Sequence, residues 1–254
     1  MSKSKRLQGR LAFVSGASRG LGRATALALA REGAHIIVTA RTSGALEELD
    51  DEIRAAGGAA TLLALDLRKS DRLDQLGPTI FQRWDKLDIL VANAGILGPL
   101  SPLPHVTADA WTSVIETNLS ANWRLIRTFD PLLQRAKAAR VVFVSSSAAT
   151  AKAAYWGPYA VSKAGLEALA KTYAHENAKT AVNVNIVDPG PMSTAMRAKA
   201  FPGEDPKTIP TPADVAELVL ELCLPSEKRN GETVRYREWS KDKNAETATA
   251  EAET

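Results

Sequence analysis

The stretch SGASRGLG at residues 15–22 decides the fold that the sequence predicts. It follows a short apolar run at residues 11–14 and leads into a helical pattern over residues 23–32. A strand, a glycine turn and a helix N-terminus suit a bound phosphate, because the first amides of a helix lack intrahelical partners and lie at the positive end of its dipole. Glycine permits positive φ in the turn and a close approach of the phosphate to the backbone. The spacing Gly-x-x-x-Gly-x-Gly alone is also compatible with a plain tight turn.

Apolar runs and helical patterns alternate along the rest of the chain. Helical patterns begin after Ser43 and at about residues 70, 107 and 158, and Pro78 is expected to restart or kink the one over 70–84. Apolar runs typical of buried parallel strands stand at residues 36–40, 60–65, 88–92, 140–145 and 182–187, with a last strand expected at 232–236. This alternation predicts one α/β domain, residues 1–239, with a doubly wound parallel sheet of about seven strands and helices on both faces. Ligands of such sheets bind at the carboxyl ends of the strands.

The composition narrows the class of protein. A chain of 254 residues with 45% hydrophobic and 24% charged residues can bury one sizeable core. The net charge is +3 and the basic residues form no aromatic-interleaved face, so no nucleic-acid partner is expected. No apolar run is long enough to span a bilayer and no signal-peptide core follows the N-terminus, so we expect a cytoplasmic protein with no membrane partner. Residues 240–254 are polar and are predicted to form a disordered or weakly ordered tail.

The sequence predicts no metal site. Cys223 is the only cysteine, which excludes an intrachain disulfide and a zinc cluster built from thiolates. The three histidines, His35, His105 and His175, are far apart and lack the paired spacing of metal ligands.

A candidate acid–base pair lies in the helix predicted at about 158–178. Tyr159 and Lys163 are four residues apart and share a helix face, and Pro158 suits the first turn. A free tyrosine titrates near pH ~10, but a cation close to its oxygen would stabilise the phenolate and lower the pKa. Tyr159 could then exchange a proton with a substrate oxygen. An amphipathic surface pair would show the same spacing.

Polar residues also follow two of the predicted strands. Ser146 stands 13 residues before Tyr159 in the run Ser145-Ser146-Ser147, where a hydroxyl could hold a carbonyl oxygen or merely complete a turn. Asn93-Ala94-Gly95 ends another strand with small residues where a nucleotide could pass. Asn118 lies in the following long helix, where asparagine is unfavourable unless its amide has a task; a solvent-facing or backbone-bonding side chain is the alternative.

Taken together, these motifs resemble those of the classical short-chain dehydrogenases/reductases, from about Gly9 to Gly231. The resemblance rests on SGASRGLG, Leu65-Asp66-Leu67, Asn93-Ala94-Gly95, Asn118, Ser146, Tyr159, Lys163 and Pro189-Gly190, in the order and spacing of the family. The segment 195–214 is similar to that of a YciK-like bacterial branch. Two departures stand out: Ser15 replaces the usual threonine, and NGETVRYREWS stands where members commonly end in a strand followed by Asp-Gly-Gly.

The resemblance implies a Rossmann fold and a catalytic tetrad of Asn118, Ser146, Tyr159 and Lys163. In that scheme Tyr159 transfers the proton, Ser146 holds the substrate oxygen, Lys163 binds the nicotinamide ribose and lowers the pKa of the phenol, and Asn118 holds a water in the proton relay. Tyr159 and Lys163 are also expected to contact the dinucleotide. The other residues expected to do so are Gly16, Ser18, Arg19, Gly20, Leu21, Gly22, Arg41, Asp66, Leu67, Asn93, Ala94, Gly95, Pro189, Gly190, Met192 and Thr194.

The expected cofactor is NADP(H) in preference to NAD(H), although NAD(H) stays possible. An NAD-selective site commonly has a carboxylate at the end of the second strand, whereas this strand ends Thr39-Ala40-Arg41. Arg19 and Arg41 could both reach a 2′-phosphate, to which a guanidinium offers a planar fork of donors. Either arginine could instead be a solvent-facing loop residue.

Two function classes remain open at this stage. The first is an NAD(P)-dependent oxidoreductase that acts on a small-molecule secondary alcohol or ketone. The second is a non-enzymatic regulatory or structural protein that binds a nucleotide on the same fold. The presence of Tyr159, Lys163, Ser146 and Asn118 together favours the enzyme. A homo-oligomer, either dimer or tetramer, is expected through the long helices at about 107–137 and 158–178.

Overall fold

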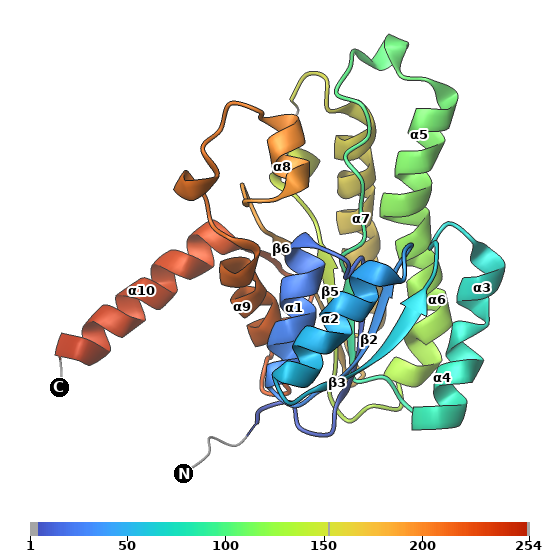
Figure 1. Ribbon diagram of the computed structural model, residues 1–254, viewed down its shortest axis with the longest axis vertical. Coiled ribbons are helices and arrows are strands. Elements are labelled where there is room, and N and C mark those ends of the chain that lie inside the picture. Colours follow the sequence, from blue (N-terminus) through green and yellow to red (C-terminus); the bar gives the residue numbers. More distant parts are fainter. Residues whose placement is uncertain (1–4, 152, 253–254) are drawn as a thin grey trace.

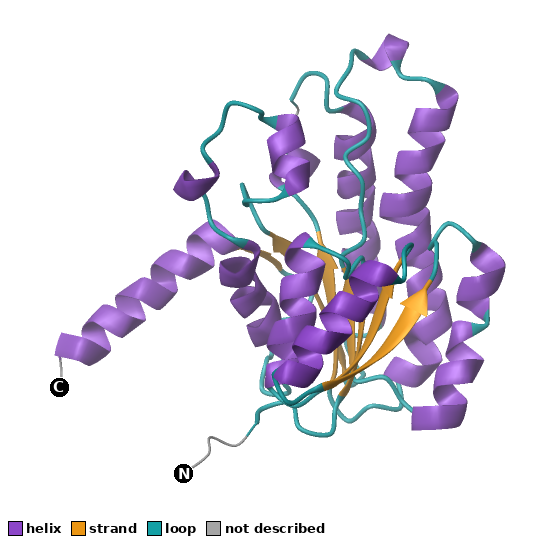
Figure 2. Cartoon of the chain, in the orientation of Figure 1, coloured by secondary structure: helices purple, strands orange, loops and turns teal. Residues whose placement is uncertain are grey.

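The computed structural model describes residues 5–151 and 153–252, which form three layers with a parallel sheet in the middle (Figures 1 and 2). The sheet has seven strands in the order β3-β2-β1-β4-β5-β6-β7, and every neighbouring pair is parallel. The strands are β1(Leu11–Ser15), β2(His35–Ala40), β3(Ala59–Ala64), β4(Ile89–Ala92), β5(Ala139–Val144), β6(Val182–Asp188) and β7(Thr233–Arg235). The predicted doubly wound sheet with helices on both faces is confirmed.

Helices cover both faces of the sheet, which explains why the central strands are buried and largely apolar. Every residue of β1, β4 and β5 is buried. One face packs against α1(Gly20–Arg31), α2(Gly44–Ala55) and α9(Pro212–Cys223). The other packs against α3(Ser70–Asp74), α4(Leu76–Trp84), α6(Ala121–Leu133) and α7(Gly157–Glu176). Two separate hydrophobic cores result, one on each side of the sheet.

Two predicted helices are divided in the structure. The pattern over 70–84 forms α3 and α4, and α4 restarts at Leu76, so that Pro78 lies in its first turn, where a missing N–H leaves no partner unsatisfied. The pattern over 107–137 forms α5(Ala108–Ile115), a π-helical turn η2(Glu116–Ser120) and α6.

A buried arginine holds the side of the sheet at which the strands begin. Arg140 on β5 is 4% exposed, and its guanidinium donates to the carbonyl oxygens of Leu224 at 3.1 Å, Pro225 at 2.7 Å and Glu227 at 2.8 Å. These bonds hold the segment after α9 against the sheet, at the edge opposite the carboxyl ends of the strands.

The sequence predicts a disordered or weakly ordered tail over residues 240–254, and the structure describes this region as far as residue 252. A helix, α10(Tyr236–Ala252), projects away from the body of the molecule (Figure 1). Its first turn is anchored because Tyr236 and Trp239, with ring centroids 5.8 Å apart, pack against the core. Farther along the helix, the Lys243 ammonium lies 3.2 Å from the Glu221 carboxylate. The alanine, glutamate and lysine residues after residue 240 favour a helix. Residues 253–254 lie outside the described part of the chain.

No helix among the described residues has both the length and the apolar character needed to cross a membrane.

Candidate active site

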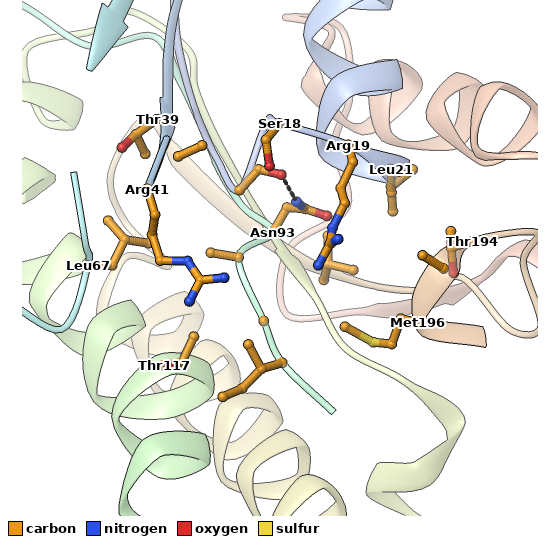
Figure 3. Close-up of a pocket in the computed structure, with 18 of the residues that line it drawn as sticks. Ser18, Arg19, Leu21, Thr39, Arg41, Leu67, Asn93, Thr117, Thr194 and Met196 are labelled. Carbon is orange, nitrogen blue, oxygen red and sulfur yellow. Dashed lines mark hydrogen bonds between the residues drawn. The ribbon is translucent and has the colours of Figure 1, made fainter. Parts of the chain in front are cut away.

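A cavity of about 470 Å³ opens at the carboxyl ends of the strands. Its wall brings together the glycine loop after β1 and the ends of β2, β4, β5 and β6 with side chains of α7 (Figure 3). Of the residues expected from the sequence, those in the wall are Gly16, Ser18, Arg19, Gly20, Leu21, Arg41, Asp66, Leu67, Asn93, Ala94, Gly95, Tyr159, Lys163, Pro189, Met192 and Thr194. The sequence motifs therefore converge on one site.

The glycine loop is shaped for close approach. Gly16 and Gly20 have φ of +67° and +58°, which side chains rarely adopt, and a Cβ on Gly16 would lie 2.8 Å from the Cα of Ala94. Gly22 lies outside the cavity wall. A Cβ on Gly22 would be 2.4 Å from both Asn93 Nδ2 and the Gly16 carbonyl oxygen, so this glycine allows α1 to pack against the loop.

Ser15 joins the loops after β1 and β4. Its hydroxyl accepts hydrogen bonds from the backbone N–H groups of Asn93 at 3.0 Å and Ala94 at 3.1 Å. The Asn93 amide in turn donates to the Ser15 carbonyl oxygen at 3.0 Å and to that of Gly16 at 3.2 Å. The serine hydroxyl thus holds the loop after β4 against the glycine loop.

Basic side chains surround one end of the cavity. Arg19 and Arg41 are exposed, and Figure 3 shows their guanidinium groups pointing into the cavity from opposite sides. The sequence reasoning missed a third arginine, Arg68, which lines the same wall. Arg68 donates through Nη2 to Asp66 Oδ2 at 2.6 Å and through Nε to both carboxylate oxygens at 3.1 Å. These hydrogen bonds lower the pKa of Asp66 to about 2.

Tyr159 and Lys163 lie buried side by side on α7, with 8% and 3% of their surfaces exposed. The Lys163 ammonium is 5.8 Å from the centroid of the Tyr159 ring and donates to the Val144 carbonyl oxygen at 2.7 Å. Burial lowers the pKa of Lys163 to about 8, and the Glu167 carboxylate acts in the opposite direction. The alternative of an amphipathic surface pair does not fit this burial.

The pKa of Tyr159 is raised, whereas the sequence argument predicted that a nearby cation would lower it. Burial is the main cause, the charge of Asp188 adds to it, and a hydrogen bond with the Ser146 hydroxyl opposes it. The physical reason for the difference is that burial disfavours the charged phenolate and that the charge acting on it, Asp188, is negative, so the one hydrogen bond from Ser146 does not compensate. The phenol is therefore protonated at neutral pH.

Ser146 and Ser145 have different partners. Ser146 lies outside the cavity wall; its hydroxyl accepts from the Ala148 N–H at 3.3 Å and interacts with Tyr159. Ser145 lines the cavity, and its hydroxyl donates to Glu167 Oε1 at 2.7 Å. Of these two serines, Ser146, the middle residue of the run 145–147, is therefore the neighbour of the Tyr159 hydroxyl.

Asn118 is fully buried in η2 and lies outside the cavity wall. Its amide donates to the Ile96 carbonyl oxygen at 2.9 Å and to Ser162 Oγ at 3.0 Å, and its side-chain oxygen accepts from the Ile96 N–H at 2.8 Å. The side chain thus bonds to the backbone, which was one of the two alternatives. It fixes the segment after β4 against α7.

The segment after β6 closes another side of the cavity. Gly190, with φ of +65°, lies outside the wall, and its N–H donates to Asp188 Oδ1 at 3.0 Å. Thr194 accepts from the Arg197 N–H at 3.2 Å and caps the short helix α8(Ala195–Ala200). The turn at Gly190 thereby directs Met192 and Thr194 into the wall.

Aromatic rings connect α8 with Tyr159. Arg197 pairs with Glu204 at 2.6 Å and lies 3.7 Å above the Phe201 ring. The Trp156 ring lies 5.8 Å from the ring of Phe201 and 5.9 Å from that of Tyr159. The sequence reasoning missed Trp156, although its position three residues before Tyr159 in a turn leading into α7 was an available signal.

No group of three or more metal-ligating side chains lies together within the described ranges. The absence of a catalytic metal stays a prediction.

Comparison with known proteins identifies the family. The family model for short chain dehydrogenases matches residues 10–205. The Escherichia coli protein YciK, an uncharacterized oxidoreductase, is 35% identical over 230 residues, which are 89% of this chain and 91% of that protein. An uncharacterized NAD-dependent oxidoreductase of Mycobacterium tuberculosis is 33% identical over 85% of this chain and 90% of its own length.

Solved structures agree with this assignment. A short chain dehydrogenase of Shigella flexneri complexed with NADP superposes with a TM-score of 0.89 and 35% identity, covering 92% of this chain and 100% of that chain. The sequence, the seven-stranded sheet and the site at its carboxyl edge lead to one conclusion: this chain belongs to the short-chain dehydrogenase/reductase family and is similar to its YciK-like members.

Proposed function

We propose that this member of an oxidoreductase family transfers a hydride between NADP(H) and a secondary alcohol or ketone, with Tyr159 moving the proton on the substrate oxygen. The observation that carries the proposal is the buried pair Tyr159 and Lys163 in the wall of the cavity, with Ser146 beside the phenol. Carbonyl reduction is the direction that a protonated phenol favours.

The cavity suits a dinucleotide. Gly16 and Gly20 leave backbone exposed where a Cβ would meet the opposite loop or require a disfavoured φ, and the first turn of α1 holds no acidic residue. A diphosphate at this helix N-terminus would receive hydrogen bonds from free amides and the favourable end of the dipole. Lys163 and Asn93 line the same cavity as this loop and Tyr159, and a nicotinamide ribose is proposed to lie beside them.

In the proposed reaction the nicotinamide supplies or accepts the hydride. This chain supplies the proton. In reduction, the Tyr159 hydroxyl gives its proton to the carbonyl oxygen as the carbon receives the hydride, and the resulting phenolate is stabilised by the Lys163 ammonium. Ser146 holds the substrate oxygen next to the phenol. Asn118 is assigned a positioning role in the proton relay, because its side chain holds the segment after β4 in place through hydrogen bonds to Ile96.

NADP(H) is the proposed cofactor. Arg19 and Arg41 point into the cavity, and β2 ends at Ala40 without the carboxylate that would repel a 2′-phosphate. Charge-assisted hydrogen bonds are worth about 1.5–3 kcal/mol each, so two could give roughly a hundredfold preference. Relatives include both a structure complexed with NADP and a protein named NAD-dependent, so the preference has to be measured.

We further propose a cytoplasmic homo-oligomer, either a dimer or a tetramer. Trp111, Trp123 and Val161 expose 37%, 47% and 47% of their surfaces on α5, α6 and α7, which are the helices expected to pair across a two-fold axis. A monomeric mass in light scattering at micromolar concentration would contradict this.

The enzyme is tested against the nucleotide-binding scaffold by a single-turnover assay with NADPH and a panel of carbonyl compounds. Tyr159→Phe is expected to slow the reaction at least about a hundredfold, because it removes the proton donor, and to leave NADPH affinity within about twofold. Tyr155→Phe is the matched control, since Tyr155 is 60% exposed and lies four residues earlier. Intact nucleotide binding without turnover of any carbonyl would favour the scaffold, and a wild-type rate in Tyr159→Phe would refute the role of the phenol.

A further inference from the structure

Asp188, the last residue of β6, is a buried carboxylate that bonds to two loops of the proposed active site. It is 6% exposed and lies outside the cavity wall. Its Oδ1 accepts a hydrogen bond from the Gly190 N–H at 3.0 Å, and the backbone of Ser147 also hydrogen-bonds to the carboxylate. A buried charge is costly unless hydrogen bonds compensate it, and these donors come from the loops after β6 and β5. The carboxylate therefore connects the two loops.

Both loops carry residues that the proposed reaction uses. Ser147 directly follows Ser146, whose hydroxyl interacts with Tyr159. Gly190, with φ of +65°, makes the turn that directs the following segment into the cavity wall, where it is expected to contact the dinucleotide. The strands β5 and β6 are parallel neighbours in the sheet, so the two loops leave it at the same edge. Asp188 thus fixes Ser146 relative to the segment expected to contact the dinucleotide.

The charge of Asp188 also acts on the phenol. Burial is the main cause of the raised pKa of Tyr159, the hydrogen bond with Ser146 opposes it, and the negative charge of Asp188 adds to it. The Lys163 ammonium, on the same helix, lies 5.8 Å from the centroid of the Tyr159 ring. A negative charge near the phenol favours its protonated form, which is the form that donates a proton in reduction.

Other charged side chains lie on the elements around the site. Burial is the main cause of the raised pKa of Asp188, and the charge of Glu167 on α7 adds to it. The two backbone hydrogen bonds and the charge of Arg235 on β7 oppose the rise. Arg197 on α8 pairs with Glu204 at 2.6 Å. Of these charges, that of Asp188 acts on the phenol.

We propose that Asp188 is a positioning residue for the proton transfer: its carboxylate ties the loop that carries Ser146 to the turn at Gly190 and so holds the serine in place. Its charge additionally favours the protonated phenol. The inference rests on the proposed role of Tyr159 in carbonyl reduction. The competing interpretation is local, with Asp188 serving only to close the turn at Gly190.

The first test measures cofactor binding and rate in Asp188→Ala. This variant is expected to weaken NADPH binding about fivefold in a fluorescence titration, because the turn at Gly190 loses a hydrogen bond. At saturating NADPH, the single-turnover rate of carbonyl reduction is expected to fall at least about tenfold, because Ser146 moves away from the phenol. An unchanged rate at saturating NADPH would overturn the inference, since the position of Ser146 would then not depend on Asp188.

Asp188→Asn separates the charge from the hydrogen bonds. The amide keeps an oxygen that can accept from the Gly190 N–H, so NADPH affinity is expected to stay within about twofold of the wild type. Loss of the negative charge is expected to lower the titration midpoint of Tyr159 by at least about half a pH unit. Tyrosinate absorbance follows this phenol once the absorbance of Tyr159→Phe is subtracted. An unmoved midpoint would overturn the action of the charge on the phenol.

Asp88→Ala is the matched control. Asp88 is another buried carboxylate, 3% exposed, and it accepts from the Leu11 N–H at 3.0 Å at the edge where β1 and β4 begin. Its loss is expected to lower stability but to leave NADPH affinity and the rate at saturating NADPH within about twofold of the wild type. Equal losses of affinity and rate in Asp88→Ala and Asp188→Ala would overturn the inference, because general destabilisation would then explain both.

The two proposals fail separately. A wild-type protein that binds NADPH but reduces no carbonyl would refute the proposed function. The NADPH affinity of Asp188→Ala and the tyrosinate titration of Asp188→Asn need no turnover, so they test the hydrogen bonds and the charge of Asp188 in either case.

Discussion

Replacing the buried Lys163 by methionine is predicted to stabilise the protein while removing its proposed activity. Holding an ammonium at 3% exposure lowers its pKa from 10.5 to about 8. Below pH 8 the lysine is charged in both the folded and the unfolded chain, so the folded protein carries the full free-energy cost of burying the ammonium, roughly 3 kcal/mol. As the pH rises from about 8 to 10.5, the folded protein loses its proton first and the cost disappears.

Methionine has a similar length and no charge. It loses the hydrogen bond to the Val144 carbonyl oxygen, worth about 1 kcal/mol, so a net gain of roughly 2 kcal/mol in the free energy of unfolding is expected at pH 7. At pH 9.5 the remaining cost in the wild type is roughly 1 kcal/mol, and the gain falls by about 2 kcal/mol from its value at pH 7.

Urea unfolding of both proteins without nucleotide, at pH 7 and pH 9.5, measures this difference. Lys171→Met is the control, because Lys171 lies on the same helix with a half-exposed side chain. The reasoning is refuted if the stability difference between Lys163→Met and the wild type is the same at both pH values. Such a result would mean that the ammonium is not desolvated.

Two further predictions concern packing. Gly22→Ala is expected to lower the free energy of unfolding by about 1–3 kcal/mol, because its Cβ would meet Asn93 Nδ2 and the Gly16 carbonyl oxygen at 2.4 Å. Gly44→Ala is the control: Gly44 has open space around it, so this change is expected to be neutral or slightly stabilising. Equal stability of the two variants in urea unfolding would contradict the prediction. Arg140→Met is expected to cost about 3 kcal/mol or more, because four carbonyl groups lose their donor. A loss below about 1 kcal/mol in the same assay would show that water replaces the guanidinium.

The sheet and the position of the site could be predicted because both depend on local patterns. Continuous apolar runs mark strands that are buried on both faces, and the carboxyl ends of parallel strands meet at one edge. The glycine loop, Asn93 and Asp66 each stand at or just beyond such an end, and Tyr159 lies in the first turn of α7, the long helix after β5; their convergence in one cavity agrees with this topology.

Other features depend on contacts that sequence spacing does not reveal. Gly22 was predicted to touch the nucleotide, but its place in the glycine pattern does not show that Asn93 packs against it. The raised pKa of Tyr159 reflects how deeply the phenol is buried, which helix periodicity alone does not give. Arg68 was overlooked because a side chain two residues from an acid has no regular direction in a loop, although Asp66-Leu67-Arg68 can be read directly from the chain.

The π-helical turn η2 has a consequence for the length of the chain. The helices α5 and α6 continue one into the other through this turn (Figure 1), but a π turn holds one more residue than an α turn. Four residues of an α-helix turn the chain by about 400°, nearly the same as this five-residue π turn, so deleting one residue from 116–120 would leave an ordinary α turn and keep the faces of α5 and α6 in place. What would change is the turn itself, which carries Asn118 and its hydrogen bonds to Ile96. The extra residue therefore affects the placement of Asn118 more than the course of the two helices.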